Sequence, residues 1–210
     1  MNVGDTLRSS AQRLPRKPAL FSVDTEISYQ SLDESVTALA KWFLEQGLEP
    51  GDRVAVRLTN SIPTVQLLYG LFKAGLTAVT VNTRLKPAEI EFILSHSQSR
   101  MCFSDPLLSP PAQQANAGCP IFTQLPALET AVAQDATSPP VDQDQPALLI
   151  YTSGTTAPPK GVVHTHRSLY HTAILASGAL GSAAFAEGVS LCILPLMHMA
   201  RSEACWDRSM

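Results

Sequence analysis

The sequence predicts an α/β fold in which β-sheets are flanked by helices. Short runs rich in Val, Ile and Thr alternate with longer segments whose apolar residues recur at helical spacing. The chain of 210 residues is 45% hydrophobic and 16% charged, which is typical of a globular protein with a packed core. Alternation of strand and helix in such a chain indicates a sheet with helices packed on it.

The first part of the chain predicts a hairpin, a helix and a strand, in that order. The hairpin is expected around Asp24 and Thr25, between the runs ALFSV and EISY. Over residues 31–47 the apolar side chains fall on one helical stripe, which predicts an amphipathic helix. The run DRVAVRL follows the turn at Pro50 and Gly51 and is typical of a strand.

The following segments continue this alternation. IPTVQLLYGLFKAG is apolar on nearly every face and predicts a buried helix, and TAVTVN predicts a strand. KPAEIEFILSHSQ predicts a helix with Pro87 near its first turn, and RMCFSD another short strand. Residues 106–146 are rich in Pro, Gln, Ala and Asp, so we expect a surface connection there, with a short strand or helix near IFTQLPALETAVA.

The last part predicts a strand, a loop and a strand over residues 146–166, then a helix over RSLYHTAILASGAL and a buried strand over GVSLCILPLMH. The net charge of -3 is spread without blocks, so no nucleic-acid partner is expected. Residues 169–186 are the most membrane-like run, but they are too polar and too short for an integral membrane span, and we expect a buried helix. No secretory signal is seen, which favours a cytoplasmic protein without excluding an organelle matrix.

The four cysteines and the histidines give little sign of a metal centre. No Cys-x-x-Cys pair occurs and the cysteine spacings match no zinc pattern, so reduced and mostly buried thiols are expected. His164 and His166 alternate along an expected strand and could face the same way, but no third ligand is apparent.

The stretch YTSGTTAPPKGVVHTH, residues 151–166, has the composition of an anion-binding loop. Glycines let the backbone approach a ligand closely, inward N–H groups and hydroxyls donate to phosphate oxygens, and a lysine adds positive charge. A hydroxyl could also reach a metal ion. The residues concerned are Thr152, Ser153, Gly154, Thr155, Thr156, Lys160 and Gly161.

Two other interpretations of this stretch remain open. Gly154 and Lys160 have the separation found in the P-loop of kinases and ATPases. However, Pro159 stands where that motif has its second glycine, Gly161 stands where it has a metal-binding hydroxyl, and a strand rather than a helix is expected next. The other interpretation is a solvated turn rich in Ser and Thr that binds nothing.

The same stretch closely resembles the phosphate-loop motif of the adenylate-forming superfamily, Tyr-Thr-Ser-Gly-Thr-Thr-Gly-x-Pro-Lys-Gly-Val. That superfamily includes acyl-CoA synthetases, firefly-type luciferases and the adenylation domains of peptide synthetases. The chain departs from the motif at Ala157, where glycine is usual. ISYQSLDE, LFKAGLTAVTVNTRLKPAEIEFILSHSQSR and LPLMHMA also resemble family segments, in the family's order, so that the resemblance covers residues 5–200.

The resemblance implies ATP-dependent activation of a small carboxylic or fatty acid to an acyl-adenylate, followed in many members by transfer to coenzyme A. An anionic nucleophile approaching a polyphosphate requires preorganised donors and Mg²⁺. By resemblance, the phosphates of ATP are held by Thr152, Ser153, Gly154, Thr155, Thr156, Lys160 and Gly161, with His166 as a further cofactor contact. Thr155 or Thr156 would touch Mg²⁺, and Lys160 and His198 are the expected catalytic residues.

His198 follows the apolar run CILPLM, so it is expected at the carboxyl end of a strand, where α/β proteins place their sites. The resemblance assigns it to the acyl pocket. Taken without the resemblance, the alternative is a histidine that caps the edge of a sheet.

Several parts of a complete family member have no counterpart in these residues. They are an aromatic-Gly-x-Thr-Glu segment, a Thr-Gly-Asp segment and a mobile C-terminal domain with a catalytic lysine. We therefore expect residues 1–200 to form part of the large adenylation domain, followed by an atypical tail over residues 201–210. Helices such as the one over residues 62–75 should then expose apolar surface. Two functions stay open: a segment of an acyl-CoA synthetase that is weak or inactive alone, with a possible complementing C-terminal half, and a non-catalytic remnant that binds nucleotide or protein weakly.

Overall fold

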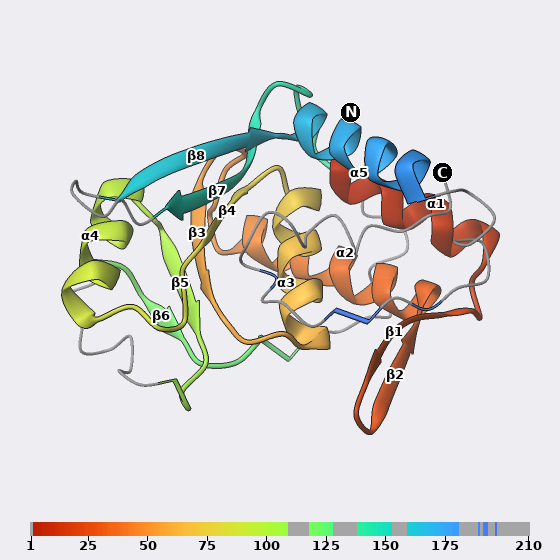
Figure 1. Ribbon diagram of the computed structural model, residues 1–210, viewed down its shortest axis with the longest axis horizontal. Coiled ribbons are helices and arrows are strands. Elements are labelled where there is room, and N and C mark those ends of the chain that lie inside the picture. Colours follow the sequence, from red (N-terminus) through yellow and green to blue (C-terminus); the bar gives the residue numbers. More distant parts are fainter. Residues whose placement is uncertain are drawn as a thin grey trace.

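The computed structural model describes residues 2–108, 118–127, 138–152, 159–180, 189, 191–192 and 196, with the side chains of residues 176–180 left out. Its elements, shown in Figure 1, are η1 (Val3–Asp5), α1 (Thr6–Arg13), β1 (Pro18–Ser22), β2 (Thr25–Ser28), α2 (Tyr29–Glu45), β3 (Arg53–Arg57), α3 (Ile62–Lys73), β4 (Thr77–Thr80), α4 (Pro87–Ser97), β5 (Met101–Ser104), β6 (Ile121–Phe122), β7 (Pro146–Thr152), β8 (Lys160–Thr165) and α5 (His166–Leu180).

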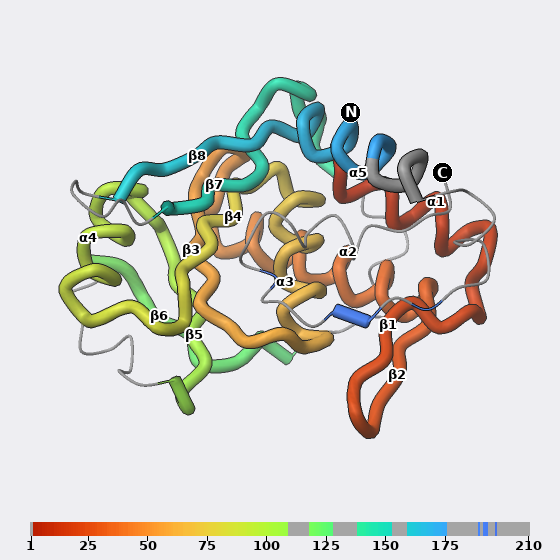
Figure 2. Tube along the Cα trace, in the orientation of Figure 1, coloured from red at the N-terminus to blue at the C-terminus, as the bar shows by residue number. Residues whose placement is uncertain are grey.

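A six-stranded sheet in the order β6-β5-β3-β4-β7-β8 forms the centre of the described part. Neighbouring strands from β6 to β7 are parallel, and β8 alone runs antiparallel to its neighbour β7. Strands β1 and β2 form a separate antiparallel hairpin, which projects away from the rest of the chain trace (Figure 2). Parallel strands align their carboxyl ends, so β3, β4, β5, β6 and β7 all end at one edge of the sheet.

Helices cover both faces of the sheet. Helices α2 and α3 lie against one face, together with the start of α5, and Figure 1 shows α4 on the other side of the strands. The face beneath α4 is held by Ile90, Ile93 and Leu94, which pack against Val79 and Cys102 of the strands. The observed architecture is therefore the α/β fold that the alternating pattern predicts.

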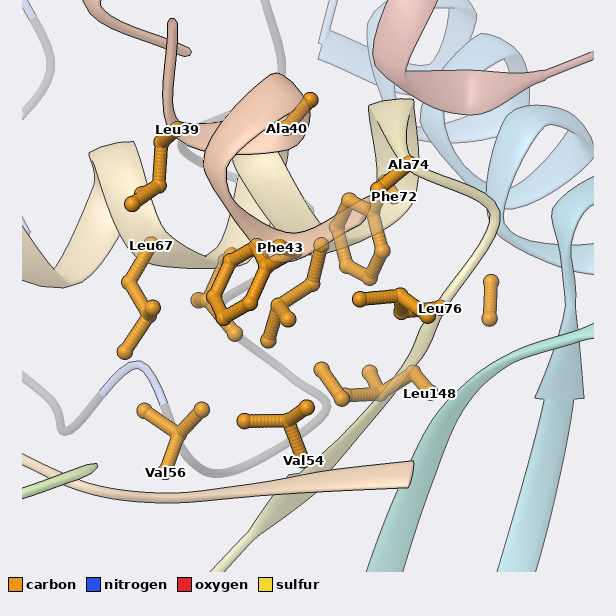
Figure 3. Packing of buried hydrophobic residues seen from close by; sticks show 14 of the residues in the cluster. Leu39, Ala40, Phe43, Val54, Val56, Leu67, Phe72, Ala74, Leu76 and Leu148 are labelled. Carbon is orange, nitrogen blue, oxygen red and sulfur yellow. The ribbon is translucent and has the colours of Figure 1, made fainter. Parts of the chain in front are cut away.

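The larger core lies between α2, α3 and the sheet. Figure 3 shows Phe43 and Phe72 facing Val54, Leu76 and Leu148, and all five side chains are buried. The central strands β3 and β4 are apolar on successive residues because both of their faces are covered. Continuous burial of this kind fixes the sheet on which the candidate site rests.

Side-chain caps set the starts of the helices. The hydroxyl of Ser28 accepts a hydrogen bond from the amide of Ser31 at 3.2 Å, where α2 begins. Ser61 caps α3 in the same way, with 3.3 Å to the amide of Thr64. At α4 the amide of Lys86 donates to the Glu89 carboxylate at 2.8 Å, which satisfies a donor that the helix itself cannot use.

The predicted hairpin, the helices over residues 31–47, 62–75 and 86–98 and the strands around them are confirmed. Two expectations need correction, and one segment was not predicted at all. Residue 166 begins α5 rather than continuing a strand, and η1 with α1 form an N-terminal helical segment that the sequence analysis did not predict. Helix α3 is not left exposed either, because Leu67, Leu71 and Phe72 are buried between α2 and the sheet. Within the described residues, no helix has the length and hydropathy needed to cross a membrane.

Candidate functional site

The candidate site lies where β7 and β8 part. The antiparallel pairing ends with Tyr151 opposite Gly161 and Thr152 opposite Lys160. We call these four residues the neck, because the phosphate-loop stretch leaves and re-enters the sheet through them. The other predicted loop residues, Ser153, Gly154, Thr155 and Thr156, lie outside the described residues, and so does His198.

The neck is at the carboxyl edge of the sheet. Strand β7 is parallel to β4, so Thr152 at its end lies on the same edge as the ends of β3, β4 and β5. In α/β proteins, this edge is where ligands bind, because loops leave the sheet there on both faces. The sequence therefore places the hydroxyl-rich stretch at a position suited to a ligand.

Two predicted binding residues, Thr152 and Lys160, are brought together at the neck. The Thr152 hydroxyl donates to the backbone oxygen of Lys160 at 3.4 Å, and both residues are exposed. Within the described ranges, Lys160 forms no ion pair with a carboxylate. Its ammonium group is thus a mobile positive charge beside the stretch that is expected to hold anionic groups.

Tyr151 fixes one side of the neck to α4. Its hydroxyl lies 2.7 Å from Nδ1 of His96, to which it can donate a hydrogen bond. The His96 ring stacks on Phe92 with 5.3 Å between ring centroids and 23° between planes. Burial raises the pKa of Tyr151 above its ordinary value.

Gly161 makes room for Leu149 and lies beside Tyr151. A Cβ atom built on Gly161 would lie 3.0 Å from Cδ1 of Leu149 and 3.5 Å from Cζ of Tyr151. The first distance is shorter than ordinary van der Waals contact, so a side chain at this position would displace its neighbours. The glycine of the motif therefore has a packing role at the neck as well as any role toward a ligand.

His166 does not lie at the neck. It follows β8 at the end opposite Lys160, and a strand of this length spans about 20 Å. The ring is fully buried, and its Nδ1 accepts a hydrogen bond from the amide of Val3 at 3.2 Å. Burial, with a smaller contribution from the charge of the amino terminus, lowers the pKa of His166 to about 4. The N-terminal segment satisfies Nδ1, whereas the other ring nitrogen, Nε2, is buried without a hydrogen-bond partner among the described residues.

The described residues hold no cluster of His, Cys, Asp or Glu side chains, and the thiols among them are wholly or partly buried. In the described part of the chain, no three His, Cys, Asp or Glu side chains come together as a metal site would require. Cys102 is a fully buried free thiol and Cys119 a partly buried one, and the partly buried Cys192 accepts a hydrogen bond from Asn60 at 3.8 Å. Burial raises the pKa of Cys102 to about 12, so this thiol is not a nucleophile at neutral pH.

A cavity of about 250 Å³ lies at the same edge of the sheet, beyond the ends of β3, β5 and β6. Its lining is mainly apolar and includes Phe103, Phe122 and Leu58, with the carboxylate of Asp105 among the polar groups. Among the predicted site residues that the structure describes, namely Thr152, Lys160, Gly161 and His166, none lines it, so we do not assign this cavity to the phosphate-loop site.

Arg57 is a residue at this edge that the sequence analysis missed. Its side chain is fully buried, and it donates to the backbone oxygen of Thr83 at 2.9 Å and to the Ser104 hydroxyl at 3.3 Å. Burial lowers the pKa of Arg57. These bonds tie the end of β3 to the segment after β4 and to the end of β5. The sequence did offer one sign of this residue, because an arginine directly follows the apolar run VAV.

The fold and the neck together define an α/β protein in which a hydroxyl-rich stretch with one lysine, Lys160, joins β7 to β8 at the carboxyl edge of a mainly parallel sheet. The model of the AMP-binding enzyme family matches residues 7–206. The chain belongs to the AMP-binding enzyme family, as the resemblance of its loop motif implied.

Relatives of known activity agree with this assignment. The chain is 33% identical over 204 residues to a sulfoacetate–CoA ligase of Cupriavidus necator. The matched region covers 90% of this chain and 39% of the relative. It is 34% identical over 183 residues to the long-chain-fatty-acid–CoA ligase FadD13 of Mycobacterium tuberculosis, covering 82% of this chain and 36% of the relative. The chain thus spans less than half the length of these relatives.

Solved structures show the same fold. The crystal structure of VinN superposes with a TM-score of 0.87 at 23% identity, over 98% of this chain and 53% of that chain. The N-terminal domain of FACL13 from Mycobacterium tuberculosis superposes with a TM-score of 0.72 at 28% identity, over 97% of this chain and 54% of that one. The described α/β architecture therefore matches a known domain fold and covers about half of each of these solved chains.

Proposed function

We propose that the chain is the N-terminal segment of an ATP-dependent, AMP-forming acyl-CoA synthetase. The observation that carries the proposal is the neck: Thr152 and Lys160 are paired at the carboxyl edge of the sheet, at the start and end of the family's phosphate-loop motif. In this role, a carboxylate attacks the α-phosphorus of ATP and gives an acyl-adenylate and pyrophosphate. The acyl group then passes to coenzyme A.

The residues of this chain would act on the phosphates. The Lys160 ammonium group neutralises oxygens of the β- and γ-phosphates, and the Thr152 hydroxyl is a donor beside it. Ser153, Gly154 and Gly161 supply amides and close approach, and Thr155 or Thr156 would contact Mg²⁺, the metal that polarises the phosphoryl oxygens when it is bound. His198 would line the acyl pocket, and His166 would support the fold from within the core.

The substrate class that we propose is a small carboxylic or fatty acid. This rests on the names of relatives, which include ligases for sulfoacetate, long-chain fatty acids and 2-succinylbenzoate. All three are carboxylic acids of different size and polarity. The common feature is the carboxylate, so the proposal stops at that group.

The first experiment measures nucleotide binding by the 210-residue chain. We expect weak binding of ATP with Mg²⁺ by isothermal titration calorimetry, and Lys160→Ala should weaken it at least about tenfold, because a charge-assisted hydrogen bond is removed. Lys41→Ala is the matched control, since Lys41 lies on α2 with 43% of its side chain exposed and forms an ion pair with Glu45 at 3.6 Å. Equal affinities of the two variants for ATP would contradict the proposed phosphate contact.

The second experiment measures carboxylate-dependent ATP–pyrophosphate exchange. We expect little or none from this chain alone, because the segments that bind adenine and ribose in the family have no counterpart among its residues. Exchange should appear when a complementing polypeptide supplies those segments. Clear exchange by the 210-residue chain alone would show that the inactivity expected of it is wrong.

The alternative function is a non-catalytic protein that binds nucleotide or another protein weakly. It is favoured by the same absence of the aromatic-Gly-x-Thr-Glu and Thr-Gly-Asp segments. The complementation experiment separates the two functions, since a remnant would bind ATP without ever gaining exchange.

A further inference from the structure

The hydrogen bond between Tyr151 and His96 links the neck to a helix that is otherwise remote from it in sequence. The hydroxyl and Nδ1 are 2.7 Å apart, across 55 residues of chain. The two rings meet edge to face, with 5.8 Å between centroids and 84° between planes. Nothing in the loop motif specifies this contact, because His96 lies in α4.

The helix end that carries His96 is itself held to the sheet. The guanidinium of Arg53 on β3 donates to the backbone oxygen of Ser97 at 3.1 Å and to the side-chain oxygen of Gln98 at 3.2 Å. Gln98 ends the helix in the left-handed conformation, with φ of 54°. The last turn of α4, which carries the exposed His96, is thereby bonded to a central strand.

Tyr151 is confined from the other side. Gly161, its partner across β7 and β8, has no side chain, and a Cβ atom there would approach the Tyr151 ring to 3.5 Å. The ring therefore lies over the backbone of Gly161 while its hydroxyl reaches α4. The Tyr151 side chain thus contacts α4 through its hydroxyl and lies beside Gly161, so it links both strands of the neck, β7 and β8, to that helix.

We infer that His96 and Tyr151 are positioning residues that hold the neck in place so that Thr152 and Lys160 stay preorganised for phosphate. The expected effect on nucleotide affinity rests on the proposed function, whereas the anchoring of the neck by these two residues does not. A ligand site built on fixed elements loses less conformational entropy on binding than one whose supports move. The side chains at positions 96 and 151 would then affect nucleotide affinity without touching nucleotide.

The test uses the 210-residue chain and three variants. Tyr151→Phe removes the hydroxyl and keeps the ring. His96→Phe removes the acceptor and keeps an aromatic ring to stack on Phe92, whereas His96→Asn places an amide oxygen near the former Nδ1. Gln30→Ala is the matched control, because it deletes an exposed hydrogen bond of 2.9 Å to Glu34 on α2, away from the neck.

Amide hydrogen exchange of residues 151–152 and 160–162 is the first measurement. We expect Tyr151→Phe and His96→Phe to speed exchange there about two- to tenfold, the range that the loss of one hydrogen bond allows. His96→Asn should restore slow exchange, and Gln30→Ala should leave the neck unchanged. Unchanged exchange in Tyr151→Phe and His96→Phe would overturn the inference, whether or not ATP binds.

Affinity for ATP with Mg²⁺ is the second measurement. We expect Tyr151→Phe and His96→Phe to weaken binding by a factor similar to their effect on exchange, with recovery in His96→Asn. Faster exchange with unchanged affinity would overturn the positioning role, because the pair would then be structural only. If the wild-type chain binds no ATP, the proposed function fails, and the exchange data alone decide whether the pair anchors the neck.

Discussion

The amide of Val3 donates a hydrogen bond to Nδ1 of His166 over 3.2 Å, and so joins residues that are 163 positions apart in the chain. The His166 ring has 0% exposed surface. The backbone next to Val3 also packs closely against α3, because a Cβ atom built on Gly4 would lie only 2.6 Å from the backbone nitrogen of Lys73. The N-terminal segment is therefore part of the core rather than an appendage.

Stability should depend on pH through His166. Burial lowers the pKa of His166 to about 4 in the folded chain, against about 6.5 for an unfolded histidine. The unfolded state therefore binds a proton first, so the contribution is complete above pH 6.5 and is lost as the pH falls from 6.5 to 4. The loss should be on the order of 2–3 kcal/mol, measured as the free energy of unfolding in urea.

A pair of variants isolates this contribution. His166→Gln keeps an acceptor for the Val3 amide but does not titrate, so its unfolding free energy should fall less steeply over this pH range. His171→Gln changes an exposed histidine on the same helix and should leave the slope as in the wild type. Identical slopes in the wild type and His166→Gln would argue against His166 as the titrating group.

The Lys73 ammonium group is a second buried polar anchor. It lies 2.6 Å from the Asp33 carboxylate and 2.5 Å from the Thr37 hydroxyl, with 2% of its side chain exposed. Asp33→Ala leaves this charge without its anion inside the protein. We expect a loss of about 3–5 kcal/mol in the free energy of unfolding, because the desolvation cost of the lysine is no longer offset.

The comparison for this prediction is the surface pair of Lys41 and Glu45, whose side chains are 43% and 58% exposed. Glu45→Ala should cost less than about 1 kcal/mol, because solvent screens the pair. If Asp33→Ala costs no more than Glu45→Ala, the buried pair does not contribute as its geometry suggests.

Periodicity was enough to predict most of the fold. The helix over residues 31–47 and the apolar runs of β3 and β4 follow from spacing and from β-branched composition, which act locally. The N-terminal helix α1 was missed because its stripe is short, and only Leu7, Ser10 and Ala11 of its eight residues are buried. Its packing depends on Gly4 and His166, contacts that sequence spacing does not reveal.

The candidate site was predictable only in its motif. Thr152 and Lys160 were expected to act together, and the antiparallel register does pair them. The support from His96 was not predictable, because that residue reaches the neck through the packing of α4 across the sheet. The resemblance assigned His166 as a cofactor contact, and the length of β8 separates it from the neck.

Ala157 gives a prediction about the loop itself, which rests on the proposed function. The family motif has glycine at this position, and if its backbone requires a positive φ, alanine costs about 1–2 kcal/mol. Ala157→Gly should then strengthen binding of ATP with Mg²⁺ by several-fold, measured by calorimetry. Unchanged affinity would show that the position has an ordinary backbone conformation.

Gly161 provides the last prediction, which concerns the neck. In Gly161→Ala, the new methyl group meets the flexible end of Leu149 at 3.0 Å and the Tyr151 ring at an ordinary contact distance of 3.5 Å. A small shift of Leu149 relieves the first contact, so we expect a cost below about 1 kcal/mol. Gly161→Val also presses on the Tyr151 ring, displaces its hydroxyl from His96 and should cost about 1–3 kcal/mol in the free energy of unfolding.

Val163→Ala is the control on the same strand, because Val163 is 53% exposed and should change stability by no more than about 0.5 kcal/mol. The sharper readout is amide exchange at residues 151–152, which should speed up in Gly161→Val but not in Val163→Ala. Equal exchange in both variants would mean that the tyrosine tolerates a side chain beneath it, and that the glycine is needed for another reason.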